Sequence, residues 1–203
     1  EKALLAAIKK KVLIIDADPQ GNASTGIGVG YEQRNPSLYD LICENKFKQE
    51  SIKKTIIPNL NIISANMNLA AAEIELVDVD NREFVLSSII SSIKGYDYII
   101  LDCPPALGLL TINSLVASTS IIIPLQSEFF ALEGISSLMS TITLIKESYN
   151  KKLDVEGIVL TMVDKRNSLS SLIEKDVRGH FKDKVYKTTI PRNVKVSEAP
   201  SHG

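Results

Sequence analysis

Short runs of apolar residues stand out along the chain. The four clearest are Val12–Ile15, Tyr98–Leu101, Ile121–Leu125 and Gly157–Met162. They are rich in β-branched residues and almost uninterrupted, a pattern typical of parallel strands whose two faces are both covered by helices. We therefore predict a buried strand at each run. Two weaker stretches, Asn61–Ser64 and Val185–Ile190, are candidates for two more strands.

Helical patterns lie between these strands. Residues 1–10 are rich in helix-forming residues and end in lysines, which suit a helix C-terminus. Apolar residues recur three or four positions apart in Asn81–Ile93, Leu132–Tyr149 and Ser168–His180. Strands that alternate with helices predict an α/β fold with a doubly wound, mostly parallel sheet flanked by helices. We find no internal repeat or linker, so we expect a single domain over residues 1–203.

The composition is that of an ordinary soluble globular protein, with 44% hydrophobic and 23% charged residues. The formal net charge is −1, so any contact with nucleic acid has to use a local basic patch. No apolar run approaches the roughly 18 residues that a membrane helix needs, and we see no signal peptide. We therefore expect a cytoplasmic protein.

The cysteines and histidines do not suggest a metal site. Cys43 and Cys103 are far apart and form no CxxC pair, so we expect both to be small buried hydrophobic residues. His180 and His202 are isolated from each other and from the cysteines. The chemistry of this chain has to be sought in its carboxylates.

The first strand ends in Asp16-Ala17-Asp18-Pro19-Gln20-Gly21-Asn22. Ligands of open α/β sheets bind beyond the carboxyl ends of the strands, which is where this segment lies. Asp, Pro, Gly and Asn also favour solvated turns. The alternative is a site where one carboxylate supports Mg²⁺ and the other positions or activates water. The complete string favours the site.

Asp102 directly follows the second strand and precedes Cys103-Pro104-Pro105. A carboxylate at this position is the Walker B arrangement, which holds Mg²⁺ beside a nucleotide. A helix-capping or turn aspartate would give the same short pattern, so Asp102 alone leaves both interpretations open. Neither proline can continue the strand's hydrogen-bond ladder, so the chain has to leave the sheet here.

Longer strings carry a resemblance to a known family. VLIIDADPQGNAST, YDYIILDCPPALGLLTINSL, PLQSEFFALEG, VLTMVD and IPRNVKVSEAPSHG occur in this order. Together they resemble the ParA/Soj chromosome- and plasmid-partitioning ATPases, which belong to the deviant Walker A class together with MinD. The similarity extends over essentially all of residues 1–203.

The resemblance implies an ATPase that uses ATP and Mg²⁺ and forms a homodimer around the nucleotide. It also implies non-specific DNA binding by the ATP-bound dimer, stimulation by a ParB/Spo0J-type adaptor, and association with the nucleoid rather than with a membrane. Asp18 matches the aspartate that positions the hydrolytic water. Asp16 and Asp102 match the carboxylates near Mg²⁺.

The adenine side of the site is carried over in the same way. The resemblance assigns Met162, Pro191 and Asn193 to positions that pack around or hydrogen-bond the base. Taken alone, Met162 would be assigned to core packing and Pro191 to a loop corner. The strings around these residues favour the nucleotide role.

The family's DNA contacts come from basic residues that the ATP dimer brings together. Arg192 and Lys195 are the first candidates here, with Arg166 and Arg178 behind them. A nearly neutral monomer fits weak DNA affinity that becomes useful when two patches are joined. A MinD-like ATPase that cycles on membranes is an alternative, but the string IPRNVKVSEAP favours partitioning.

The segment Gln126–Gly134 follows another predicted strand. In the family, this segment lies near the dimer face and responds to the nucleotide state. An ordinary strand-to-helix connection with its aromatic residues in the core would explain the same residues. Both interpretations stay open.

The family's phosphate-binding pattern, K-G-G-x-G-K-[ST], does not occur in the 203 residues. In that pattern, glycines let backbone N–H groups approach the phosphates and lysines supply positive charge. We expect that the sequence lacks the family's first strand and phosphate loop before Glu1, and its last segment after Gly203. A fragment of a normal ATPase is the favoured explanation, and a catalytically inactive binding or regulatory module is the alternative. Whether this chain is an enzyme therefore stays open.

Overall fold

The computed structural model describes residues 9–128, 131–164 and 166–193. The chain forms two compact units, which divide between Ala117 and Ser118. The single domain expected over residues 1–203 stays a prediction. We describe each unit by itself, because each has its own sheet and helices.

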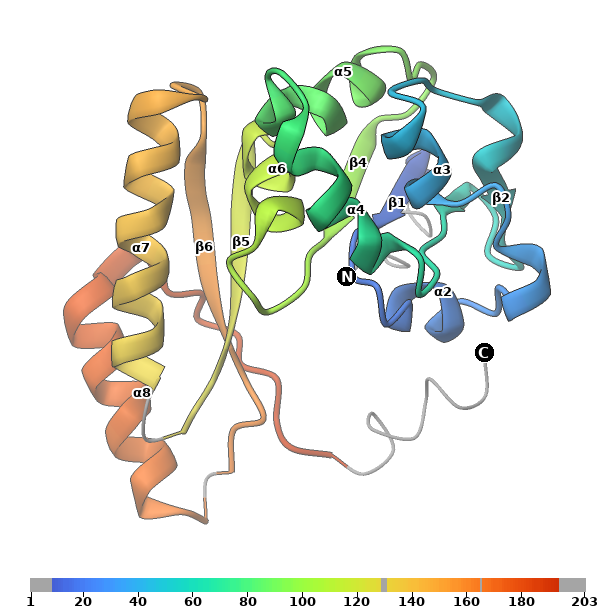
Figure 1. Cartoon of the computed structure of the whole chain (residues 1–203). Helices are drawn as coiled ribbons and strands as arrows, with labels where there is room; N and C mark the ends of the chain where they lie inside the picture. Colours follow the sequence, from blue (N-terminus) through green and yellow to red (C-terminus); the bar gives the residue numbers. More distant parts are fainter. Residues whose placement is uncertain (1–8, 129–130, 165, 194–203) are drawn as a thin grey trace. The chain divides into compact units, whose positions relative to one another are not determined.

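The first unit is built on a four-stranded sheet (Figure 1). Its strands are β1 (Val12–Asp16), β2 (Ile52–Lys54), β3 (Leu60–Ile63) and β4 (Tyr98–Asp102), in the order β2-β3-β1-β4. β1 pairs in parallel with both β3 and β4, whereas the short β2 is antiparallel to β3. The central position of β1 places its carboxyl end between two parallel neighbours.

Short helices surround this sheet. The α-helices are α2 (Asn22–Gly26), α3 (Leu38–Cys43), α4 (Leu69–Glu75), α5 (Val85–Ser91) and α6 (Leu109–Ala117). The 3₁₀ turns are η1 (Tyr31–Gln33), η2 (Gln49–Ser51), η3 (Leu76–Asp78) and η4 (Arg82–Phe84). Leu13 and Ile15 of β1 belong to the larger core cluster, which also contains buried residues of α3, α4 and α5. Val12 and Ile14 point into a second cluster, so both faces of β1 are buried.

The second unit contains two strands, β5 (Ser120–Gln126) and β6 (Asp154–Thr161), which pair in parallel. Helix α7 (Ala131–Ser148) connects them, and α8 (Ser168–Phe181) follows β6 and leads into the 3₁₀ turn η5 (Lys182–Lys184). The side chain of Asn167 caps α8 by accepting a hydrogen bond from the backbone N–H of Leu169 at 3.0 Å. No helix in the described part of the chain is long and apolar enough to cross a membrane.

The predicted α/β fold with mostly parallel strands is confirmed, and so are the five strands predicted before residue 163. The prediction of a strand over Val185–Ile190 is wrong. This stretch meets β6 only at isolated positions, through the N–H groups of Tyr186 and Ile190, and forms no continuous ladder. β4 and β5 are also more exposed than predicted, because each is the outermost strand of its sheet.

Of the predicted helices, two are confirmed in full and one is shorter than predicted. α7 and α8 confirm the two long patterns. The predicted helix Asn81–Ile93 is shortened, because Asn81 has a left-handed backbone and a 3₁₀ turn precedes α5. For residues 1–10, only Lys9 and Lys10 fall within the described range; Lys9 has a positive φ of 66° and is not helical.

The expected burial of the cysteines is wrong. Both Cys43 and Cys103 are exposed, and both are free thiols. Cys43 lies at the end of α3, where its thiol donates a hydrogen bond to Glu75 at 2.9 Å instead of packing into the core. Partial loss of water around the thiol and the bond to Glu75 raise the pKa of Cys43 to about 11, so the thiolate is disfavoured.

Candidate functional site

Strand pairing brings two of the predicted site carboxylates together. Asp16 and Asp102 are the last residues of β1 and β4 and are directly paired in the parallel register. Neighbouring strands lie about 4.8 Å apart, and paired residues point to the same face of the sheet. The backbone bond from Ala17 N–H to the Asp102 carbonyl, at 2.8 Å, extends the pairing just past the strand ends. Two negative side chains therefore leave the sheet side by side.

Ser24 holds the Asp16 carboxylate from the start of α2. One carboxylate oxygen of Asp16 accepts two bonds from Ser24, from its backbone N–H at 2.8 Å and from its hydroxyl at 2.7 Å. The Ser24 hydroxyl also accepts a bond from Ala65 N–H at 3.2 Å, which ties this group to the end of β3. Sequence reasoning missed Ser24, although its place in the string DPQGNAST was a usable signal.

Burial and hydrogen bonding shift the pKa of the Asp16 carboxyl in opposite directions. The residue is fully buried, and burial raises the pKa of its carboxyl because the charged form loses water. The bonds from Ser24 lower that pKa, while the neighbouring charge of Asp102 raises it further. Burial and the hydrogen bonds from Ser24 together fix the position of the Asp16 carboxylate.

Asp18 lies just beyond the strand, in a tight turn, and is only partly buried. Its carboxylate accepts a bond from Gln20 N–H at 2.9 Å, and its carbonyl accepts one from Gly21 N–H at 2.9 Å. Gly21 has a left-handed backbone with φ 65°, which closes the turn before α2 begins. The turn places Asp18 outside the sheet edge and leaves its second oxygen available for other partners.

The predicted adenine-contact residues meet in the second unit. Met162 directly follows β6, has a positive φ of 54°, and is 37% exposed. The next residue, Val163, forms a parallel bridge with Pro191, with bonds from Val163 N–H to the Ile190 carbonyl and from Arg192 N–H to the Val163 carbonyl, both 3.1 Å. Met162 and Pro191 are thereby brought close together, and Asn193 follows two residues later.

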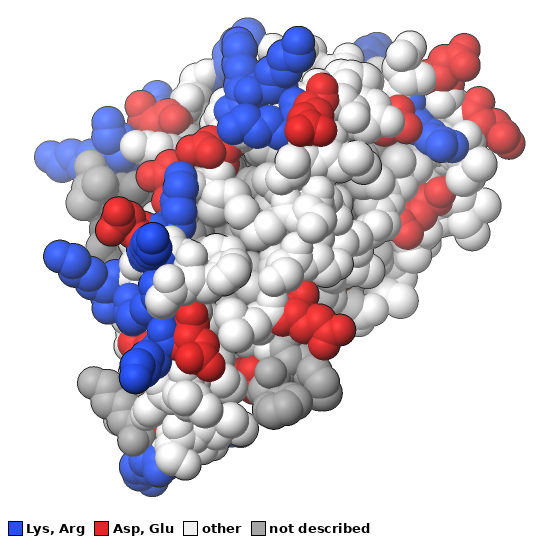
Figure 2. Space-filling view, turned by 90° about the vertical axis from the view of Figure 1, so that its left-hand side faces the viewer, with Lys and Arg blue, Asp and Glu red and all other residues white. Residues whose placement is uncertain are grey.

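Of the predicted DNA-contact residues, Arg192 is exposed and Lys195 lies outside the described residues. Arg166 bonds to both carboxylate oxygens of Asp164 at 3.1 Å. Arg178 binds Glu174 at 2.9 Å and the carbonyl oxygen of Tyr186 at 3.0 Å. On the face seen in Figure 2, a group of Lys and Arg side chains gathers at the top, and along the left side basic and acidic side chains alternate.

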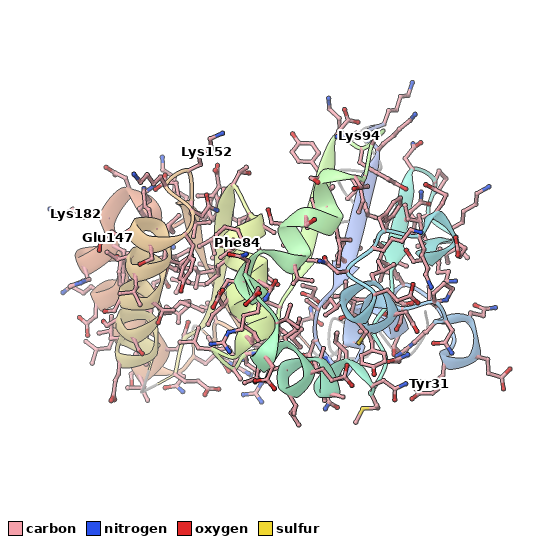
Figure 3. All side chains as sticks on the ribbon, turned by 45° about the horizontal axis from the view of Figure 1, so that its top comes forward. Tyr31, Phe84, Lys94, Glu147, Lys152 and Lys182 are labelled. Carbon is pink, nitrogen blue, oxygen red and sulfur yellow. The ribbon has the colours of Figure 1, made fainter. Side chains whose placement is uncertain are left out.

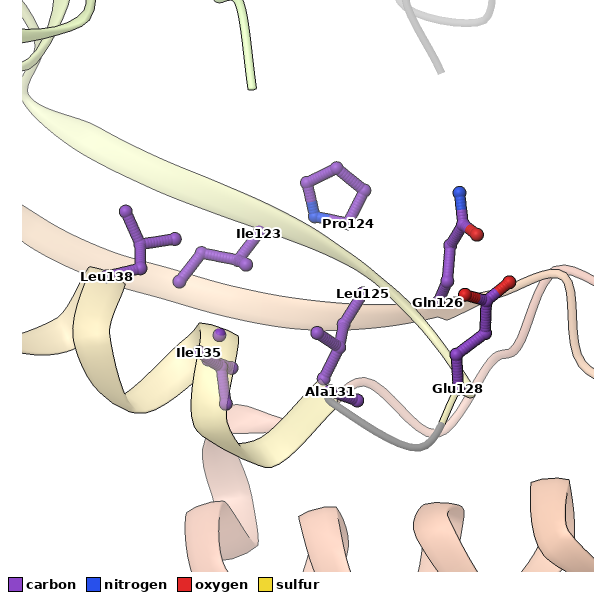
Figure 4. A pocket seen from close by; sticks show the side chains of 9 residues that line it. Ile123, Pro124, Leu125, Gln126, Glu128, Ala131, Ile135 and Leu138 are labelled. Atoms are coloured by element: carbon purple, nitrogen blue, oxygen red, sulfur yellow. The ribbon is translucent and has the colours of Figure 1, made fainter. Parts of the chain in front are cut away.

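A pocket of about 340 Å³ lies beside β5 and the start of α7 (Figure 4). Aliphatic side chains form its floor, and Gln126 and Glu128 stand at one end. The aliphatic residues include Ile123, Leu125, Ala131, Ile135 and Leu138. Part of the pocket's lining comes from the segment Gln126–Gly134. For this segment the sequence leaves two interpretations open, a position near a dimer face and an ordinary strand-to-helix connection.

The carboxylate pair fits a hydrated Mg²⁺ better than a metal held by protein alone. Among the described residues, no three His, Cys, Asp or Glu side chains gather closely enough to form a metal cage. Mg²⁺ typically takes one or two carboxylates and completes its shell with water and substrate phosphates. Asp16 and Asp102 supply that number of carboxylates, and Asp16 is already oriented by Ser24.

Comparisons with known proteins agree on the family. A family model described as an AAA domain matches residues 2–155. The sporulation initiation inhibitor protein Soj of Bacillus subtilis is 49% identical over 202 residues, which cover 99% of this chain and 80% of Soj. The chromosome partitioning protein ParA of Caulobacter vibrioides is 48% identical over 202 residues, covering 98% of this chain and 76% of ParA.

Solved structures support the fold. Cobyrinic acid a,c-diamide synthase from Mycobacterium smegmatis, with a bound ATP analogue and magnesium, has a TM-score of 0.88 at 30% identity, covering 99% of this chain and 83% of that one. A plasmid partition protein from Borrelia burgdorferi has a TM-score of 0.78 at 23% identity, covering 99% and 87%. Since the family model and the curated relatives span most of the sequence, the chain belongs to the ParA/Soj family of chromosome-partitioning ATPases.

Proposed function

We propose that this chain carries the water-positioning, magnesium-binding and adenine-binding parts of an ATP-dependent DNA-partitioning switch. The observation that carries the proposal is the pairing of Asp16 with Asp102 at the carboxyl edge of the sheet, with Asp18 in the adjoining turn. Carboxylates in this arrangement suit phosphoryl transfer to water, in which catalysis consists mainly of positioning and charge stabilisation.

Each acidic residue has a separate role in this proposal. Asp18 orients the attacking water, because its carboxylate extends past the strand end and is only partly buried. Asp16 and Asp102 would hold Mg²⁺ through water. When bound, the cation neutralises charge on the nucleotide phosphates. Ser24 fixes the orientation of Asp16.

Met162, Pro191 and Asn193 are proposed to receive the adenine. The partly exposed thioether of Met162 offers a polarizable surface to an aromatic ring. The bridge between Val163 and Pro191 fixes the two backbone segments at this point. Asn193 can donate and accept hydrogen bonds on the edge of a base.

The assignment of Asp18 is tested with Asp18→Ala in the full-length gene product. We expect ATP turnover to fall by about 100-fold or more, while ATP is still bound, because only the water loses its partner. The measurements are steady-state phosphate release and equilibrium binding of ATP. Turnover at the parental rate would show that Asp18 has no such role.

The assembly steps of the switch belong to the same proposal. ATP would join two copies into a homodimer, Arg192 and Lys195 of both copies would contact DNA without sequence preference, and a ParB/Spo0J-type adaptor would stimulate hydrolysis. Two weak patches joined in one dimer bind DNA far more tightly than one. Arg192→Ala should therefore weaken DNA binding in ATP and reduce its salt dependence. Unchanged binding would exclude Arg192.

A further inference from the structure

Arg34 is a buried cation that the proposed mechanism does not use. It follows the 3₁₀ turn η1 and is only 5% exposed. Arginine is rarely buried unless it is paired with a carboxylate. Among the described residues, no carboxylate lies within ion-pair distance of the Arg34 guanidinium. The burial of this charge therefore needs another explanation.

The guanidinium is satisfied by neutral acceptors from three separate segments. Nη2 donates to the hydroxyl of Thr25 at 2.7 Å, Nη1 to the Ala65 carbonyl at 3.3 Å, and Nε to the Val29 carbonyl at 3.4 Å. Thr25 lies on α2 and Ala65 follows β3. The planar fork of arginine can reach several acceptors in fixed directions, which the single ammonium of lysine cannot.

The backbone of Arg34 is anchored as well. Its carbonyl accepts a bond from the Ser64 hydroxyl at 2.9 Å, and Tyr31 lies 5.4 Å from the guanidinium carbon, measured to the ring centre. Tyr31 is itself 63% exposed, and Figure 3 labels its position in the first unit. Both ends of Arg34 are thus tied to the segment that leaves β3.

Gly21 shows how closely the guanidinium approaches the turn that carries Asp18. A side chain at Gly21 would collide with Nη1 of Arg34 and would press on the Ala65 carbonyl. The Gly21 carbonyl also accepts a bond from the Thr25 hydroxyl at 3.1 Å, and that same hydroxyl accepts from Arg34. Arg34 therefore supports the turn Asp16–Gly21 through its close approach to Gly21 and its bond to Thr25.

We propose that Arg34 is a positioning residue that fixes the Asp16–Gly21 turn, and with it the water-orienting Asp18, without touching the nucleotide. The inference rests on the proposed function of Asp18, but the contacts with Gly21 and Thr25 stand independently of it. Shifting reacting groups by about 1 Å can cost about 100-fold in rate. A looser turn should therefore slow hydrolysis more than it weakens nucleotide binding.

The test compares Arg34→Lys and Arg34→Met with Arg82→Lys in the full-length gene product. Arg82 is a matched control, since its guanidinium binds the Val77 carbonyl and Glu83 elsewhere in the first unit. We expect both Arg34 variants to lower kcat for ATP at least about tenfold, with KM within about threefold of the parent. Arg82→Lys should change neither constant.

Amide hydrogen exchange provides a readout that needs no ATP turnover. In Arg34→Lys, the amides of residues 17–24 should exchange at least about tenfold faster, while those of β3 keep the parental rates. Arg82→Lys should not accelerate them. If the parent shows no ATP turnover, the proposed function fails, and exchange alone still decides whether Arg34 holds the turn.

Gly21→Ala disturbs the same contact from its other side. It should also lower kcat, because its methyl group meets Nη1 of Arg34 and because alanine is strained at the φ of 65°. An Arg34→Lys variant with parental kcat and parental exchange at residues 17–24 would overturn the proposal. Arg34→Met is interpreted only if its melting curve remains cooperative.

Discussion

The two units differ in how they hold their site residues. In the first unit, Asp16 ends a fully buried strand and is bound by both polar groups of Ser24. In the second, Met162 and Pro191 are exposed and are placed by backbone bridges next to β6. The difference fits the proposed roles, because orienting water would demand exact geometry, whereas an adenine ring would tolerate a softer apolar contact.

The sharpest way to break this comparison is to shorten one aliphatic side chain in each unit. Ile15→Ala, at a fully buried position in β1, should lower the free energy of unfolding by about 3 kcal/mol through lost burial and a cavity. Leu144→Ala, at a 62% exposed position on α7, should cost less than about 0.5 kcal/mol. Urea unfolding measures both. Equal losses of free energy would show that the position in β1 and the position on α7 do not differ in how tightly they are packed.

Ser24→Ala tests the polar support of Asp16. The change removes one donor to a buried carboxylate and the acceptor of Ala65 N–H, so we expect a loss of about 1–3 kcal/mol. Ser136→Ala is the matched control, since residue 136 is exposed and its hydroxyl donates to the Leu132 carbonyl within α7. The same urea titration gives both values. If Ser24→Ala lowers the free energy of unfolding no more than Ser136→Ala does, Ser24 does not stabilise the position of Asp16.

Asp16→Asn tests the energetic cost of the buried charge. Burial raises the folded-state pKa of the Asp16 carboxyl above its ordinary value of 3.8. The protonated carboxyl therefore contributes its full stability below pH 3.8, and this contribution is lost as the pH rises through the folded-state pKa. Asparagine does not ionise. Relative to the parent, the melting temperature of the variant should therefore rise between pH 4 and neutral pH.

The control for that change is Asp80→Asn, at an exposed position in the same unit. It should shift the melting temperature little at either pH, since a surface charge contributes little. Thermal melts between pH 4 and pH 8 measure both variants. A difference in melting temperature between Asp16→Asn and the parent that stays the same from pH 4 to pH 8 would contradict the raised pKa of Asp16.

The smallest expected effect on stability is at Met162. Met162→Gly relieves a positive φ but adds backbone entropy to the unfolded chain, so the free energy of unfolding should change by less than about 1 kcal/mol. Binding of ADP should nevertheless weaken severalfold, because the thioether is lost. Met162→Leu retains apolar bulk and should bind close to the parent. Calorimetric titration of both variants would reject the adenine contact if neither changed affinity.

Sequence patterns predicted the strands and the family better than the local support of the site. Continuous apolar runs identify β1, β4, β5 and β6, because burial requires them. Short helices such as α2 and α4 escaped prediction, since five to seven residues show too little periodicity. The strand predicted at Val185–Ile190 failed because alternation cannot reveal whether a partner strand is met continuously or at isolated points.

The carboxylates of the candidate site were found from their place after strands, but their supports were not. Besides their nearer partners, Ser24 and Arg34 both contact Ala65, which is distant in sequence. A serine and an arginine in a polar loop look like ordinary surface residues until the fold brings β3 beside them. Long-range contacts of this kind leave no periodic signal.

The parallel register of Asp16 with Asp102 also has a consequence for how this gene can change. The spacing of the two acids depends on strand pairing and not on the length of chain between them. Insertions or deletions in the loops between β3 and β4 would leave that spacing intact. A single extra residue inside β4 would turn Asp102 to the opposite face of the sheet. Length variation among descendants should therefore be confined to the connections.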